Sequence, residues 1–293
     1  FNLFIYAQWG SPLMWDVAII VLYTLMALSM GYLGTREDLV KCMKAFPKKK
    51  GLYNLLALGY TDISPQAIRR DKKILRVFAF LSIPGAVLLH SVTAWILGLI
   101  KATPGWHTAL LAPLFVGSAL VSGIALVILA AILSRKALKL DIEDKVILDL
   151  GKLFLFLIPI LGYFLFAELL TISFAGVPEP MAFFKTIMVG PFAPIFWFDM
   201  ILGIIVPFFI ILIPALRTVT GVGIASLLVI LGVFAERAII VIPPLLNRFM
   251  LTSSASYSPT AVEVILTIGV FALGVLAFAI LAKITPLAEL KEE

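Results

Sequence analysis

Apolar runs long enough to cross a membrane recur along the whole chain. A helix rises about 1.5 Å per residue, so about 20 apolar residues cover a hydrocarbon core of roughly 30 Å. Seven stretches reach this length: 13–33, 75–100, 107–133, 153–174, 195–216, 222–243 and 261–283. The pattern predicts an all-α, polytopic bundle of transmembrane helices that forms a single domain over residues 1–293.

The longest polar stretch, residues 35–73, lies between the first two apolar runs. Within it Leu39, Met43 and Phe46 recur at helical spacing beside lysines, which is typical of a short helix that lies on a membrane surface. We therefore expect a cytoplasmic basic loop over 35–73 that carries an interfacial helix.

Basic residues gather on one side of the predicted bundle. Nineteen of the 23 Lys and Arg lie in or beside the loops 34–74, 134–152 and 217–221 and the tail from Lys283. By the positive-inside rule this side is cytoplasmic, which places Phe1 outside. The net charge of +6 is then explained by topology and contact with anionic lipid, and we expect no nucleic-acid partner. The expected location is the cell (inner) membrane.

Composition excludes several other classes of protein. A content of 62% hydrophobic and 14% charged residues, with a mean hydropathy of +1.11, is foreign to soluble globular domains. A single cysteine, Cys42, excludes a disulfide framework and an iron–sulfur cluster made by this chain alone. The sequence opens on Phe1 without a methionine or a signal-peptide pattern, so we expect that this start is a truncation.

Ionisable residues inside the apolar runs are the candidates for chemistry, because each costs about 3 kcal/mol or more at the bilayer centre. From the helical rise, His90, Glu168 and Glu236 are expected at one level, roughly 21–22 Å from the inner edge. A second set is expected near the outer edge: Asp16, Asp199, Glu263 and His107. The sequence thus predicts one polar site, formed by several helices in the outer part of the bilayer.

Simpler interpretations of these residues stay open. A lone buried histidine such as His90 is more often an interhelical hydrogen-bonding group than a ligand. Asp199 and Glu263 begin predicted helices, where a carboxylate complements the helix dipole. Arg237 lies about five residues from the outer end of its helix, so its side chain can extend to the lipid headgroups.

Several short motifs occur together along the chain. They are Trp15-Asp16, Gly59-Tyr60 to Lys73, His90-Ser91-Val92-Thr93-Ala94-Trp95, Gly105-Trp106-His107-Thr108 with Ala112-Pro113, Glu236-Arg237 running into Val241-Ile242-Pro243, and Tyr257-Ser258-Pro259-Thr260 before Glu263. In this combination the chain resembles the NrfD/PsrC family of quinone-interacting membrane subunits, above all the longer ActC, DsrP, HmcC and QrcD-like members. The resemblance implies that the chain is the C-terminal part of an eight- to ten-helix protein made of two four-helix bundles.

The same resemblance implies a function. Such a subunit holds no haem or iron–sulfur cluster of its own, binds menaquinol or ubiquinol near the outer face, and exchanges electrons with a ferredoxin-like iron–sulfur subunit docked there. Other membrane subunits, and cytochrome or molybdopterin-type subunits, fit the same kind of complex. Quinol oxidation also releases protons, which need acceptors beside the ring oxygens.

Site residues follow from the motifs and the expected depths. We predict Asp16 and His90 as the primary quinol-interacting, catalytic pair. Quinone binding is assigned to Asp16, His90, Glu168, Arg237 and Trp95, and proton transfer to Glu168, Glu236, His107 and Asp199. No metal site is predicted.

Two other classes of protein would use similar features. An ion or solute transporter would use the same intramembrane charges, and its broken helices would account for prolines such as Pro84 and Pro159. The spans show no obvious inverted repeat, however, and their inner halves lack charged residues. A retinal-binding sensor is excluded because Lys283 lies at the inner end of the last span, where no mid-helix Schiff base forms.

Overall fold

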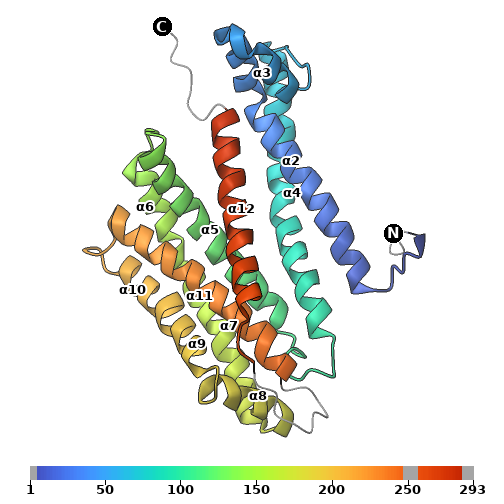
Figure 1. Cartoon of the computed structure of the whole chain (residues 1–293), viewed down its shortest axis with the longest axis vertical. Coiled ribbons are helices and arrows are strands. Elements are labelled where there is room, and N and C mark those ends of the chain that lie inside the picture. The colour runs from blue at the N-terminus through green and yellow to red at the C-terminus, as the bar shows by residue number, and fades with distance from the viewer. Residues whose placement is uncertain (1–4, 247–256, 286–293) are drawn as a thin grey trace. The chain divides into compact units, whose positions relative to one another are not determined.

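The computed structural model describes residues 5–246 and 257–285, and these residues form helices and loops without a strand. Within these two ranges, seven helices are long and apolar enough to cross a membrane, which confirms the predicted number of spans. The helices are α2 (Pro12–Ala45), η1 (Pro47–Lys49), α3 (Lys50–Leu56), α4 (Pro65–Gly98), α5 (Leu111–Ala137), α6 (Asp144–Lys152), α7 (Phe154–Ala175), α8 (Pro178–Met188), α9 (Ala193–Phe198), η2 (Asp199–Ile205), α10 (Val206–Leu212), α11 (Val219–Leu246) and α12 (Ala261–Ile284) (Figure 1).

The contacts divide the chain into two compact units. The first comprises the described parts of residues 1–15 and 90–257, and the second those of residues 16–89 and 258–293. Two helices contribute to both units: α2 changes unit after Trp15, and α4 changes unit after Leu89.

The first unit is a bundle built around α11. This helix packs against α5, against α6, against α8 and against the continuous segment α9–η2–α10, while α7 packs against α5 and α10. An apolar cluster forms most of its core, with Ile128, Phe154 and Val222 among the side chains that are almost fully buried. Burial of this kind fixes the four spans α5, α6–α7, α9–η2–α10 and α11 relative to one another.

The second unit contains most of α2 and α4, the short helices η1 and α3, and α12. Leu39 and Met43 belong to α2 itself, so they do not form the separate short helix expected over this stretch. They pack with Tyr53 and Ala57, which keeps α2 helical up to Ala45. The position of residues 35–73 at a membrane surface stays a prediction.

Helix ends in the second unit follow local chemistry. Ser64 caps α4, where its hydroxyl accepts the N–H of Ala67 at 3.3 Å and Pro65 occupies the first turn. The backbone N–H of Ser64 donates to Asp62 at 2.8 Å, and this bond holds the pKa of Asp62 below its ordinary value. Thr260 and Glu263 form a capping box at the start of α12, which confirms the helix-terminus interpretation of Glu263.

Candidate functional site

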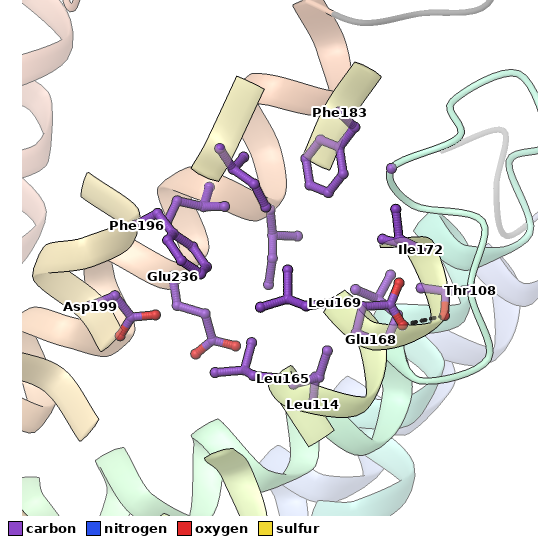
Figure 2. A pocket seen from close by; sticks show the side chains of 15 residues that line it. Thr108, Leu114, Leu165, Glu168, Leu169, Ile172, Phe183, Phe196, Asp199 and Glu236 are labelled. Atoms are coloured by element: carbon purple, nitrogen blue, oxygen red, sulfur yellow. Dashed lines mark hydrogen bonds between the residues drawn. The ribbon is translucent and has the colours of Figure 1, made fainter. Parts of the chain in front are cut away.

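A cavity of about 70 Å³ lies inside the first unit. Fifteen residues line it, from α5, α7, α8, α9, η2, α11 and the loop 99–110. Most are leucine, isoleucine or phenylalanine, and three are acidic: Glu168, Asp199 and Glu236. Figure 2 shows Asp199 and Glu236 at one end of the cavity and Glu168 at the other, with Leu165 and Leu169 between them.

Asp199 is placed by an irregular turn in its helix. It begins the π-helical segment η2, directly after α9, and only 5% of its surface is exposed. The interpretation of Asp199 as a helix-terminal carboxylate is therefore wrong, because the residue lies inside a continuous helical span. π-Turns of this kind are rare and occur frequently at functional sites.

Two glycines make room for the Asp199 carboxylate. A Cβ atom on Gly203 would lie 2.7 Å from Asp199 Oδ1 and 2.7 Å from the Cα atom of Gly232. A Cβ atom on Gly232 would lie 3.0 Å from the same oxygen. The close crossing of η2 and α11 thus depends on glycine in both helices, and Asp199 Oδ1 fills the notch between them.

Glu236 follows Gly232 by one helical turn on α11, so both residues share the face that meets η2. Its side chain is 4% exposed, and Oε1 has no hydrogen-bond partner among the described residues. This buried carboxylate oxygen can therefore accept a hydrogen bond or a proton.

Glu168 on α7 is held by the loop that precedes α5. The Thr108 hydroxyl donates to Glu168 Oε2 at 2.7 Å and accepts the backbone N–H of Leu110 at 3.2 Å, as Figure 2 shows for the first of these bonds. One hydroxyl therefore joins the loop to the carboxylate and fixes one of its two oxygens.

The loop itself is tied to α11 by Trp106. Its indole N–H donates to the Ile240 carbonyl at 2.5 Å. In a regular helix that carbonyl would accept the N–H of residue 244, but Pro244 has none. A Cβ atom on Gly105 would lie 3.1 Å from Phe183 and from Pro244, so the loop lies close against α8 and α11. Trp106 was not among the predicted site residues, and the signal that would have found its role is the Pro243-Pro244 pair.

Arg237 turns toward the bundle and not toward the headgroups, so the interpretation of Arg237 as a lipid-facing residue is wrong. Its Nη2 donates to the Ser118 hydroxyl on α5 at 2.5 Å, and its guanidinium lies 3.9 Å from the centre of the Phe115 ring. The charge of Arg237 interacts with the carboxylates of Glu236 and Asp199 and also reaches His90. Arg237 therefore lies within electrostatic reach of both the acidic cavity and His90.

The remaining predicted site residues lie outside the cavity lining. His90 is half-buried on α4, and Trp95 is 42% exposed on the same helix. His107 is exposed, and its Nδ1 shares a hydrogen bond of 2.9 Å with the Gly98 carbonyl. Asp16 is half-buried on α2 in the second unit, so its pairing with His90 stays a prediction.

The dimensions of the cavity limit its chemistry. Pockets for organic ligands usually measure about 300–1,000 Å³, whereas one water needs about 10–15 Å³ on the scale used for small cavities. The cavity of about 70 Å³ therefore has room for a few water molecules and is smaller than the usual pockets for organic ligands. Among the described residues, no group of three or more His, Cys, Asp or Glu side chains is arranged to hold a metal ion.

Comparison with known proteins finds relatives that are named as subunits of reductases and of an oxidoreductase. The chain is 30% identical, over 91% of its length, to a protein of Halobacterium salinarum named as a membrane subunit of dimethyl sulfoxide reductase, of which the match covers 63%. It is 28% identical, over 99% of its length, to a selenate reductase subunit of Mesobacillus selenatarsenatis, covering 71% of that protein.

A third relative is the Hdr-like menaquinol oxidoreductase integral membrane subunit of Archaeoglobus fulgidus. The identity is 32% over 73% of this chain, and the match covers 58% of that protein. The chain thus spans less than two thirds of the length of two of these three relatives.

The sequence of residues 1–247 also matches the family described as polysulphide reductase, NrfD. This match takes in the cavity, its three carboxylates and both glycines of the helix crossing. Together with the seven apolar helices, it shows that the chain is an integral membrane protein that belongs to the NrfD polysulphide reductase family.

Proposed function

We propose that this chain is a membrane subunit of a respiratory oxidoreductase complex, which binds menaquinol or ubiquinol near the outer face and exchanges electrons with a partner iron–sulfur protein. The observation that carries the proposal is the gathering of three carboxylates around one small cavity inside an apolar bundle. Buried acids are costly in a membrane and are typical of proton-transfer sites. Quinol oxidation is a reaction that needs such a site.

The names of the relatives support this proposal. Two are named as subunits of reductases and one as a subunit of a menaquinol oxidoreductase. Proteins with these names work as parts of complexes, so partner subunits are expected here as well. A ferredoxin-like iron–sulfur subunit at the outer face, with cytochrome or molybdopterin-type subunits beyond it, would provide the electron path that this chain does not itself contain.

The size and lining of the acidic cavity support a division of the predicted residues into two groups. The quinone ring is assigned to the region of His90 and Trp95 on α4, because the acidic cavity is smaller than the usual pockets for organic ligands. The pairing of His90 with Asp16 stays a prediction. Glu168, Asp199 and Glu236 then take the protons. Arg237, whose charge reaches both His90 and Glu236, connects the two groups.

The test is quinol-dependent reduction of the partner protein in membranes that contain the whole complex. Asp16→Asn and His90→Ala should each lower turnover at least tenfold, which is within the usual contribution of a positioned acid or base, about 10²–10⁴. Asp141→Asn removes a carboxylate from an exposed loop position and should leave turnover unchanged. Wild-type turnover in both site variants, with the complex assembled, would contradict the assignment.

The second candidate is an ion or solute transporter, favoured by the buried acidic cavity and by the prolines within α4, α7 and α11. The two functions differ in what accompanies the purified protein. Bound quinone and the visible absorbance of haem or iron–sulfur partners support the oxidoreductase. A colourless, quinone-free protein that accumulates a solute in vesicles supports transport.

A further inference from the structure

The second unit contains a pocket that the proposed electron and proton transfer does not use. It measures about 480 Å³, within the range of small-molecule sites. It lies where α2 ends and the short helices η1 and α3 begin, at the end of the unit where Figure 1 labels α3. The lining residues are Val40, Met43, Lys44, Pro47, Lys50 and Thr61.

Contacts on both sides of the pocket hold its walls in place. Arg36 on α2 forms an ion pair with Asp71 on α4, and its guanidinium lies 3.8 Å from the centre of the Tyr60 ring. The Tyr32 hydroxyl donates to the Ala57 carbonyl at 3.0 Å. The segment between α3 and α4 is therefore fixed against α2, and the pocket is formed before any ligand arrives.

Positive charge at the pocket is only partly neutralised. Residues 35–76 contain eleven basic and four acidic residues. Arg36 is paired with Asp71, and Lys41 with Glu37 at 2.9 Å. Among the described residues, neither Lys44 nor Lys50 has an ion pair, although both line the pocket. Two lysines in the lining of one pocket favour an anionic ligand.

Exposed apolar side chains beside the lysines identify the kind of anion. Phe46, Leu52, Leu55 and Leu58 are 45%, 41%, 71% and 76% exposed. Leu52 and Leu55 are three residues apart on α3, so they lie on one face of that helix. Exposed leucine and phenylalanine next to lysine is the pattern of an element that lies in a membrane interface. A soluble acidic partner would give no reason for these leucines.

The length of α2 places the pocket beyond the hydrocarbon core. A helix of 34 residues is about 51 Å long, against a core of roughly 30 Å. Side chains on a helix lean toward its N-terminus. The side chain of Lys44, near the end of α2, therefore leans back along the helix toward its apolar part.

We propose that this pocket binds the phosphate headgroup of an anionic phospholipid. Lys44 and Lys50 pair with the phosphate, the Thr61 hydroxyl donates to it, and the acyl chains run toward the leucines of α3. Clusters of lysine directly beyond a transmembrane helix are a general means of binding anionic lipid. The site would anchor the loop between α2 and α4 to one leaflet.

The test counts lipids bound to the full-length protein in its complex, by native mass spectrometry after reconstitution in phosphatidylcholine with phosphatidylglycerol. Lys44→Gln with Lys50→Gln should weaken binding of one phosphatidylglycerol by about 25-fold, because each lysine contributes about fivefold near an anionic surface. Lys44→Arg with Lys50→Arg should keep that lipid.

The matched control is Lys136→Gln with Lys145→Gln, which removes the same charge from exposed positions of the first unit. It should leave the phosphatidylglycerol bound. Equal loss in the control variant would show a general surface-charge effect and overturn the proposal. Equal binding of phosphatidylcholine, or displacement of the lipid by millimolar inorganic phosphate alone, would also overturn it, the latter in favour of a site for free anions.

Discussion

At the scale of single residues, the first unit holds three acidic side chains in apolar surroundings, and their hydrogen-bond partners differ. Glu168 receives a hydroxyl hydrogen bond, Asp199 fills a glycine notch, and Glu236 Oε1 has no partner among the described residues. An unmet buried polar atom costs about 1–3 kcal/mol. Stability alone does not explain such a residue, which is why Glu236 is the strongest candidate for proton transfer.

The first prediction follows from this difference in hydrogen bonding among the three acids. Glu236→Gln and Glu168→Gln remove a titratable group with little change in shape, so quinol-dependent turnover in intact complexes should fall at least tenfold. Glu179→Gln, at an exposed position on α8, should have no effect. Normal turnover in both cavity variants would contradict this prediction and would show that the protons released from quinol do not pass through Glu168 or Glu236.

The second prediction concerns the bond between Trp106 and the Ile240 carbonyl. Trp106→Phe leaves a buried carbonyl without a donor, so the free energy of unfolding should fall by about 1–3 kcal/mol. Pro244→Ala restores a backbone N–H at the helical position for Ile240, and in that background the cost of Trp106→Phe should be smaller. Denaturant titration in detergent of the wild type, the two single variants and the double variant measures the free energies of unfolding for this double-mutant cycle. If the losses of the two single variants add up in the double variant, Pro244 does not create the need for Trp106.

At the scale of elements, apolar length predicted all seven spans, because a helix in lipid must be apolar for about 20 residues. Span ends were less predictable, since tertiary contacts decide them: the packing of Leu39 and Met43 against Tyr53 extends α2 to Ala45. The π-helical turn of η2 could not be predicted. This turn occurs where Gly203 packs closely against Gly232. The sequence contains both glycines but does not show that they are in contact in the fold.

The sequence also predicted the candidate site in part: it identified the charged residues but not the loop residues that hold them. Intramembrane charge singled out Glu168, Glu236, Asp199 and Arg237, and the structure places all four at or beside one cavity. The proton-transfer role expected for His107 stays a prediction: its exposed ring forms a hydrogen bond with the carbonyl of Gly98 at the end of α4 and does not line the cavity. Thr108 and Trp106 were missed as site residues, because their roles depend on a loop that folds back onto distant helices.

The third prediction tests the helix crossing. Gly203→Ala puts a methyl group 2.7 Å from both Asp199 Oδ1 and Gly232, and overpacking of this kind costs about 1–3 kcal/mol. Thermal unfolding in detergent should show the loss. Gly162→Ala is the control, since its Cβ atom would meet Ile204 at an ordinary 3.8 Å. If the two variants are equally stable, the crossing is looser than described.

At the scale of the whole molecule, the acidic cavity and the basic pocket belong to different units of the chain. The first unit holds the acidic cavity, while the second carries Asp16 at one end of α2 and the basic pocket at the other. The two helices that belong to both units, α2 and α4, carry the predicted quinol pair near the residues where they change unit, Trp15 to Asp16 and Leu89 to His90.

The last prediction concerns the side on which protons leave. The acidic residues lie in the part of the spans predicted to be outer, whereas the inner halves offer mainly hydroxyls such as Ser122 and Ser226, and both of these donate to carbonyls of their own helix. Such hydroxyls do not support a proton path toward the basic side. In sealed vesicles of known orientation, a pH-sensitive dye on the side opposite the basic loops should report acidification during quinol oxidation, and Glu236→Gln should slow it. Acidification on the side of the basic loops would show that protons leave by an inner path, which would have to run through helices other than those that line this cavity.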